Sequence, residues 1–218
     1  GFESLRAHQV ATCPPSQEPR VTTSQTSAEP RSWLFIPGDS EKKLGKADEC
    51  GADAVIIDLE DAVAPTNKRA ARALTVDFLS ARPADARASQ LWVRVNPLAG
   101  EYCEEDVAAI VAAAPDGLML PKAEGPDDVE RLSAMVDAAG GVPAIRIVAI
   151  ATETPRAVFR LNAFADRTPA RLAGLTWGAE DLAAAIGASG NRHADGRFHD
   201  SFLMARSLTL LAAHAVGV

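Results

Sequence analysis

Two stretches of the chain, IRIVAIATETP at residues 145–155 and LAGLTWGAED at residues 172–181, decide its fold. Each is an apolar run that leads to a carboxylate, Glu153 in the first and Asp181 in the second, just before a helix-forming segment. Pro155 disfavours helix at the residue before it and suits a first helical turn, so Glu153 is predicted at a strand-to-helix junction. In a parallel sheet such junctions share one edge, where strands lie about 4.8 Å apart. Glu153 and Asp181 are therefore predicted to converge.

The same strand-then-helix pattern recurs along the chain from Ser32. Apolar runs predict six strands, at residues 32–36, 54–59, 91–95, 118–120, 145–152 and 172–177. Helical periodicity and capping residues predict helices at residues 41–50, 65–81, 104–113, 127–139, 155–165, 181–186 and 198–215. Strict alternation of strands and helices indicates a parallel α/β sheet.

This alternation fits either a doubly wound sheet or a TIM-type (β/α)8 barrel. A doubly wound dinucleotide-binding fold needs a GxGxxG turn after its first strand, and PGDS at residues 37–40 does not supply one. Short strands that end in polar residues favour the barrel. Those residues are Asp58, Arg94, Lys122, Glu153 and Asp181. Because a closed barrel takes about 250 residues, we predict a barrel truncated after its sixth β/α unit, lacking the last two strands, over residues 31–218.

Composition limits the class of protein. A chain of 218 residues with 47% apolar content can bury one core, and no apolar run is long enough for a membrane span. The net charge of −7 without a dense basic block argues against a nucleic-acid partner, although a local basic patch for a phosphorylated ligand stays open. Three cysteines, Cys13, Cys50 and Cys103, form no CxxC pair and favour a reducing, cytoplasmic compartment. Residues 1–30 are rich in Pro, Ser and Thr and are predicted to be a disordered tail.

The carboxylates Glu153 and Asp181 predict a Mg²⁺ site. This ion commonly takes one or two protein carboxylates and completes its octahedral shell with water and substrate oxygens. Alternatively, each acid caps the helix that follows it, since negative charge is favourable at a helix N-terminus. Arg94 is a charge inside an apolar strand, so it needs either an anionic ligand or a structural partner such as Asp58 or Glu60.

Further charged residues follow the second and fourth predicted strands. Asp58, Glu60 and Asp61 concentrate acid after the second strand, where they could hold Arg94, orient metal-bound water or simply form a solvated loop. Lys122 adds positive charge after the fourth strand, either for a substrate or as an exposed loop residue.

Two more pairs of residues are candidates for binding. Lys42 and Lys46 lie four apart on one predicted helix face, where they could hold a phosphate-bearing ligand or form an ordinary solvated surface. His193 and His199 flank a polar, Gly-rich stretch and are interpreted as loop histidines.

Six motifs, in order along the chain, resemble those of the HpcH/HpaI aldolase and citrate lyase superfamily, and most closely its citrate lyase β-subunit-like branch. The motifs are RSWLFIPG (31–38), DLEDAV (58–63), VRVN (93–96), LPK (120–122), ETP (153–155) and GAEDL (178–182). The resemblance implies a TIM barrel, Mg²⁺ dependence and a homo-oligomer, often a trimer. It also implies cleavage or formation of a carbon–carbon bond in a citryl-, malyl- or citramalyl-CoA-like thioester, with acetyl-CoA and an oxo acid as the other side of the reaction.

The resemblance also assigns roles by position. Glu153 and Asp181 match the metal ligands, Glu153 lies against the substrate as well, and Arg94 matches the catalytic residue that grips the oxo acid. Lys42 and Lys46 match positions that contact CoA phosphates. Asp58, Glu60 and Lys122, which follow the second and fourth predicted strands, are predicted to bind substrate beside Arg94.

Two departures from the family pattern limit these assignments. Phe35 stands where some relatives have a tyrosine, so one hydroxyl contact is lost. Family members continue into two further strands and a C-terminal segment that supplies an acid and a lid, so no general acid or base is assigned here. The first interpretation is a Mg²⁺-dependent acyl-CoA lyase; the alternatives are a class II-type aldolase acting on free 2-oxo acids and a catalytically silent, subunit-like paralogue.

Overall fold

A computed structural model of the chain describes residues 29–218. The disordered tail predicted over residues 1–30 therefore lies outside the described residues except for its last two positions, and so does Cys13.

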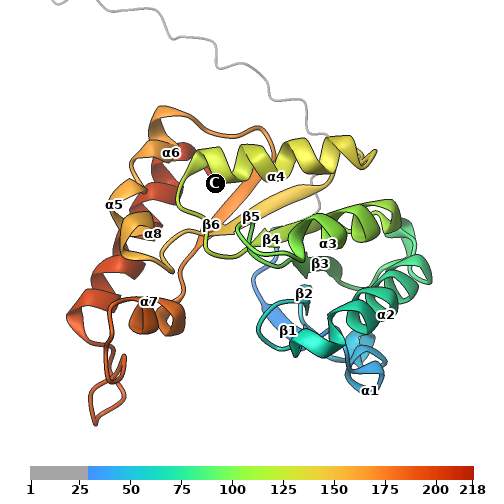
Figure 1. The fold of residues 1–218 in the computed structure, drawn as a ribbon, viewed down its shortest axis with the longest axis horizontal. Helices are drawn as coiled ribbons and strands as arrows, with labels where there is room; N and C mark the ends of the chain where they lie inside the picture. The colour runs from blue at the N-terminus through green and yellow to red at the C-terminus, as the bar shows by residue number, and fades with distance from the viewer. Residues whose placement is uncertain (1–28) are drawn as a thin grey trace, which may run out of the picture.

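Six parallel strands form one sheet in the order in which they occur along the chain (Figure 1). They are β1 (Trp33–Pro37), β2 (Ala54–Asp58), β3 (Gln90–Arg94), β4 (Gly117–Leu120), β5 (Arg146–Ile150) and β6 (Leu172–Thr176). A doubly wound sheet reverses its strand order part-way, and this sheet does not. The predicted TIM-type α/β arrangement is confirmed. Within residues 29–218, β1 and β6 do not pair with each other, so the barrel is open.

Helices connect successive strands and lie around the outside of the sheet (Figure 1). The α-helices are α1 (Glu41–Leu44), α2 (Lys68–Ser80), α3 (Cys103–Ile110), α4 (Pro126–Ala138), α5 (Pro155–Arg160), α6 (Ala163–Asp166), α7 (Ala179–Ala185) and α8 (Asp200–Val216). Short 3-10 helices are η1 (Ala47–Glu49), η2 (Pro65–Asn67), η3 (Ala84–Ala86) and η4 (Val111–Ala113). The single helices predicted at 41–50 and 155–165 are wrong in one respect, since each is divided in two.

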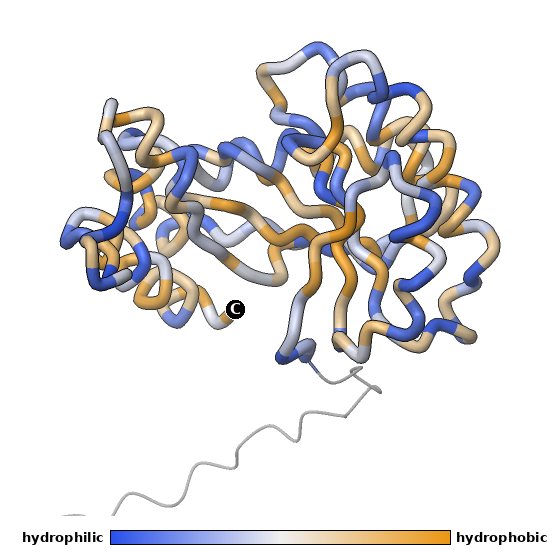
Figure 2. The backbone as a smooth tube through the Cα atoms, turned by 90° about the horizontal axis from the view of Figure 1, so that it is seen from below, coloured by the Kyte–Doolittle hydropathy of each residue, from blue (hydrophilic) through white to orange (hydrophobic). Residues whose placement is uncertain are grey.

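The strands are largely hydrophobic along their length (Figure 2), and their side chains alternate between two apolar clusters. Side chains such as Val55 and Ile57 point toward the helices and belong to the main core. Their neighbours on the other face, among them Ile56 and Trp92, form a second cluster on the inner, concave side. This alternation follows from the two-residue period of a strand, and it buries all five residues of β2.

Gly117 shows how closely the inner layer is packed. A Cβ atom at this position would lie 2.2 Å from a ring carbon of Trp92, which is buried. Only the absence of a side chain lets β4 lie beside that indole.

None of the helices in the described part of the chain is both long and apolar enough to cross a membrane.

Candidate active site

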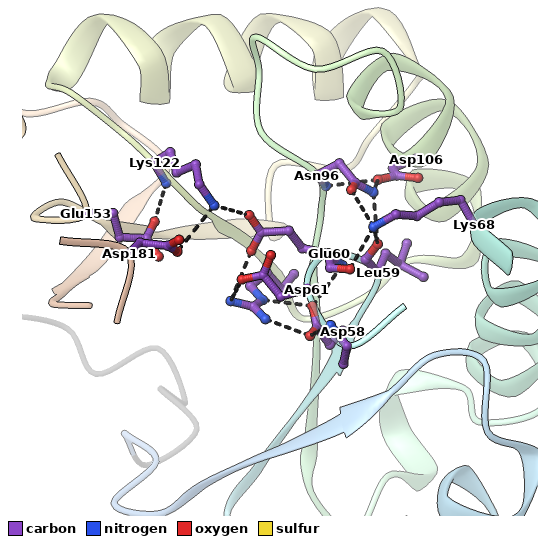
Figure 3. Close-up of polar contacts among 12 residues, drawn as sticks. Asp58, Leu59, Glu60, Asp61, Lys68, Asn96, Asp106, Lys122, Glu153 and Asp181 are labelled. Atoms are coloured by element: carbon purple, nitrogen blue, oxygen red, sulfur yellow. Dashed lines mark hydrogen bonds and ion pairs between the residues drawn. The ribbon is translucent and has the colours of Figure 1, made fainter. Parts of the chain in front are cut away.

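The polar residues that follow the strands gather at one end of the sheet (Figure 3). Asp58 ends β2 and Arg94 ends β3, and these two residues are directly opposite each other in the register. Lys122 follows β4, Glu153 follows β5, and Asp181 lies in the first turn of α7 after β6. The structure thus brings together six of the predicted residues, with Glu60 from the loop after β2.

Glu153 and Asp181 lie side by side, as the sequence predicted (Figure 3). The alternative that Glu153 caps a helix is wrong: Thr154 is the N-cap of α5, and its hydroxyl accepts a hydrogen bond from the amide of Ala157. Asp181 makes no capping bond either, since Gly178 is the N-cap of α7. Both carboxylates are therefore available to face the site.

Glu153 is almost fully buried, and burial raises its pKa to about 8. The hydrogen bond that it accepts from the backbone amide of Lys122 opposes this rise, whereas a hydrogen bond with Asp181 and the charge of Asp181 reinforce it. Gly178 gives Glu153 its room, because a Cβ atom there would lie 2.8 Å from Cγ of Glu153.

Lys122 links the two halves of the site. Its backbone is left-handed, with φ of 54°, a conformation that is uncommon for a non-glycine residue and concentrated at functional sites. This turn directs the amide at Glu153, while Nζ donates to Oε1 of Glu60 at 2.6 Å and lies 3.3 Å from Oδ2 of Asp181. Burial alone would lower the pKa of Lys122, but the bond to Glu60 and the nearby carboxylates outweigh it and raise the pKa.

Arg94 is held against Asp58. Its Nε and Nη2 donate to the two carboxylate oxygens of Asp58 at 2.7 and 2.6 Å. Burial opposes the charged guanidinium, yet these bonds and the neighbouring acids raise the pKa of Arg94, which stays charged. Of the two alternatives for Arg94, the structure shows the structural partner, Asp58, with Glu60 nearby. Because a guanidinium has five N–H donors, the pair leaves others for a ligand.

Glu60 carries an unsatisfied buried oxygen. Its Oε2 lies 3.0 Å from Nη1 of Arg94 as an ion pair, but the angle does not make a hydrogen bond, and no other partner is present among the described residues. Burial raises the pKa of Glu60 even though Lys122 and Arg94 oppose the rise. A buried acceptor without a hydrogen bond is costly, and a bound ligand or water would relieve that cost.

The residues present fit a hard divalent cation bound through few protein ligands. Within residues 29–218 no group of three or more His, Cys, Asp or Glu side chains could enclose a metal. Mg²⁺ does not need such an enclosure, since one or two carboxylates suffice with water and substrate oxygens. The paired carboxyl groups of Glu153 and Asp181 repel each other when both are ionised, and a cation between them would remove that repulsion.

The two lysines predicted to contact CoA lie outside this cluster. Lys42 is in α1, whereas Lys46 follows Gly45 and precedes η1, so the prediction of one shared helix face is wrong. Both residues are exposed, and neither side chain has a partner among the described residues. His193 and His199 lie on the predicted loop, with their rings 3.9 Å apart between centroids.

Sequence analysis missed a second polar layer behind the loop that carries Glu60. Lys68, Asn96 and Asp106 are buried and hydrogen-bonded to one another or to this loop (Figure 3). The sequence pattern places Lys68 in the predicted helix at residues 65–81 and Asn96 directly after the predicted strand at residues 91–95. The available signal was that Asn96 belongs to the VRVN motif and that Lys68 lies five residues after the DLEDAV motif.

A cavity of about 440 Å³ lies on the concave face of the sheet. Its lining is mostly apolar and includes Trp33, Phe35, Trp92 and Trp177. None of the six clustered residues, Asp58, Glu60, Arg94, Lys122, Glu153 and Asp181, lines it, so we place the chemistry in the polar cluster and not in this cavity.

Curated relatives cover most of this chain. A citrate lyase subunit beta-like protein of Mycobacterium tuberculosis is 37% identical over 85% of this chain and 60% of its own length. A (3S)-malyl-CoA thioesterase of Cereibacter sphaeroides is 36% identical over 86% of this chain and 60% of its own length. The chain thus spans about 60% of the length of these curated relatives.

Solved structures of the M. tuberculosis protein CitE share the fold. One, in complex with magnesium and pyruvate, has a TM-score of 0.69 and 34% identity and covers 85% of this chain and 69% of that chain. Another, with magnesium, acetoacetate and coenzyme A, has the same TM-score and identity and covers 85% of this chain and 62% of that chain. The family model described as HpcH/HpaI aldolase/citrate lyase matches residues 31–218. The chain therefore belongs to the HpcH/HpaI aldolase/citrate lyase family.

Proposed function

We propose that this chain carries the catalytic residues of a Mg²⁺-dependent lyase that cleaves or forms a carbon–carbon bond in a hydroxyacyl-CoA of the citryl-, malyl- or citramalyl-CoA type. The observation that carries the proposal is the convergence of Glu153 and Asp181 at the sheet end that also holds Arg94 and Lys122. The M. tuberculosis relative that binds magnesium, an oxo acid and coenzyme A supports the same ligands here.

The residues of the site form two groups, a metal side (Glu153 and Asp181) and an oxo-acid side (Arg94 with Asp58 and Glu60). Glu153 and Asp181 would hold Mg²⁺, whose chemistry there is that of a Lewis acid at the oxygen that becomes a carbonyl. Arg94, fixed by Asp58, directs its remaining N–H donors to the oxo-acid carboxylate and oxygen. Lys122 keeps its charge between the two sides and orients the carboxylate of Glu60.

Assays with citryl-, malyl- and citramalyl-CoA, each with Mg²⁺ and with EDTA, test this function. We expect one thioester to yield acetyl-CoA and an oxo acid only when Mg²⁺ is present. Asp181→Asn should lose Mg²⁺ binding and turnover, whereas Glu180→Gln is the matched control, because Glu180 is the exposed neighbour that bonds Asn191. Binding of Mg²⁺ without turnover of any thioester would favour the silent, subunit-like alternative.

Substitution of Lys42 and Lys46 tests whether the substrate is a CoA thioester or a free oxo acid. Both ammonium groups are free to contact phosphate. Replacing both lysines with alanine should raise KM for the acyl-CoA and leave Mg²⁺ binding unchanged. An unchanged KM would favour the aldolase alternative, in which these lysines have no role.

A further inference from the structure

Lys68, at the first position of α2, is a buried cation outside the residues assigned to the site. Its ammonium donates to the carbonyl oxygens of Leu59 and Glu60, each at 2.7 Å, and to Oδ1 of Asn96 at 2.8 Å. An ammonium has three N–H donors, so all three are used. Burying such a group is expensive, and an apolar side chain could fill the same space at lower cost.

Two of the three hydrogen bonds of Lys68 are made to one loop. Leu59 and Glu60 belong to the segment of residues 58–62, which begins at the end of β2 and contains the acids Asp58 and Glu60 that contact Arg94. On its other side, the amides of Glu60 and Ala62 donate to the two oxygens of Asp58, at 2.9 and 3.0 Å. The loop is therefore fixed by its carbonyls on one side and by its amides on the other.

Asn96 and Asp106 complete this support. The side-chain amide of Asn96 donates to the carbonyl of Leu59 at 3.0 Å and to Oδ2 of Asp106 at 2.6 Å. Asp106 in turn accepts from Nε of Arg72 at 3.0 Å. Burial lowers the pKa of Lys68, while the nearby acids, Asp106 first, oppose that fall. Lys68, Asn96 and Asp106 are each hydrogen-bonded within the network, whereas Nη2 of Arg72 contacts Oδ1 of Asp106 as an ion pair at 2.9 Å without a hydrogen bond.

We infer that Lys68 is a positioning residue for the oxo-acid side of the site: by holding the carbonyls of Leu59 and Glu60, it directs the Glu60 side chain to Arg94 and Lys122. Figure 3 shows Lys68 at the backbone of Glu60 and Lys122 at its carboxylate. This inference rests on the proposed function, because it assigns Lys68 to the oxo-acid side. Lys68 itself contacts neither Glu153 nor Asp181. Its link to them is indirect, through Nζ of Lys122, which bonds Glu60 at 2.6 Å and lies 3.3 Å from Asp181.

That separation gives a test that does not depend on turnover. Titration calorimetry would measure Mg²⁺ binding first, and then pyruvate binding at saturating Mg²⁺. For Lys68→Met we expect pyruvate to bind roughly 10- to 100-fold more weakly, since a small displacement of a positioned group has effects of this size. The Mg²⁺ affinity should stay within about twofold of the unsubstituted chain. A residue with only a structural role would weaken both ligands together or neither.

Arg87→Met is the matched control. Arg87 is also a cation with a largely covered side chain, and it makes three bonds of 2.9 Å, to the carbonyls of Arg82 and Ala114 and to Oδ2 of Asp116. These contacts lie at the opposite end of β3, where Asp116 accepts from the amide of Leu91. Arg87→Met should therefore destabilise the fold without changing the affinity for pyruvate.

Asn96→Ala keeps the test decisive if Lys68→Met does not fold. This change removes one acceptor of Lys68 and one donor to Leu59, so a smaller loss of pyruvate affinity with unchanged Mg²⁺ binding is expected. Unchanged pyruvate affinity, or equal loss of both ligands, in whichever of these variants folds would overturn the role of Lys68 alone. Absence of pyruvate binding by the unsubstituted chain would overturn the proposed function and this role with it.

Discussion

The position of Glu153 in the proposed Mg²⁺ site depends on Gly178 having no side chain. A Cβ atom there would lie 2.8 Å from Cγ and 3.1 Å from Oε1 of Glu153. Gly178→Ala should displace the carboxylate and weaken Mg²⁺ binding by roughly 10- to 100-fold, the range seen for groups that orient metal ligands. Calorimetric titration with Mg²⁺ measures this. Gly190→Ala is the control, since nothing lies within 4 Å of a Cβ atom there; equal affinities in both variants would contradict the steric argument.

Asp58 makes stability depend on pH. Burial alone would raise its pKa, but the bonds and charge of Arg94 and the amides of Glu60 and Ala62 outweigh burial and lower the pKa below its ordinary value of 3.8. A carboxyl group whose pKa is lowered in the folded state stabilises the fold above its unfolded pKa, and this stability is lost as the pH falls through the folded value.

Asp58→Asn should therefore destabilise the protein near neutral pH by about 3 kcal/mol, because it leaves Arg94 with a weaker partner. The difference from the unsubstituted chain should shrink as the pH falls below about 4. Urea unfolding followed by circular dichroism between about pH 7 and about pH 3 measures both effects. A difference that stays constant across this range would show that the charge of Asp58 is not what stabilises the loop.

The sequence predicted where Glu153 and Asp181 lie, and which acids contact Arg94, because each of these residues follows an apolar run that forms a strand. It did not predict Lys68, because a lysine at a helix start is usually solvated. Its burial depends on contacts with the carbonyls of Leu59 and Glu60 and with Asn96, which no local pattern reveals. The left-handed backbone of Lys122 was also missed, since no glycine or asparagine marks it.

Among the elements, β4 and β3 are joined by an unusually close contact. A Cβ atom at Gly117 would lie 2.2 Å from the ring of Trp92, and the indole is 1% exposed, so it has little room to move. Gly117→Ala should cost about 1–3 kcal/mol of stability through overpacking. Thermal or urea unfolding measures this.

Gly174→Ala in β6 is the control for that contact. Its nearest atom would be Cγ2 of Val148 at 3.6 Å, an ordinary van der Waals distance. Little loss of stability is expected from this substitution. Equal destabilisation by the two changes would mean that replacing any glycine in these strands lowers stability, whether or not the new side chain meets Trp92.

The sequence predicted every strand to within a few residues because apolar runs and following prolines define them. The points at which a predicted helix is interrupted were harder to predict. Residues 41–50 contain Gly45, and the chain turns there into η1, whereas helical charge spacing alone suggested one continuous helix. Local periodicity does not reveal where packing against the sheet ends a helix.

The whole molecule has two sheet edges that are unpaired among residues 29–218, at β1 and β6. Trp33, Leu34 and Phe35 on β1 are 38%, 41% and 46% exposed, which leaves apolar surface beside free backbone groups. Such an edge favours pairing with another chain. We expect this chain to self-associate with rising concentration in sedimentation velocity.

Leu34→Lys should weaken that association by about tenfold or more, because charge on an edge strand opposes pairing. Val142→Lys is the control, since Val142 is 50% exposed but lies in the loop before β5. Association that is equally sensitive to both substitutions would place the contact elsewhere. The sequence predicted the open barrel from the number of strands, but it could not predict which side chains the open edges leave exposed.

The consecutive strand order also governs how far apart the binding groups lie. Asp58, Arg94, Lys122 and Glu153 come from β2, β3, β4 and β5 in turn or from the residues just after them, so each is one strand spacing further along the rim. Bending the sheet more tightly would shorten the span from Arg94 to Glu153 without altering either residue. Core substitutions beneath the strands, at positions that do not contact the ligand, would therefore change whether the site prefers a shorter or a longer ligand.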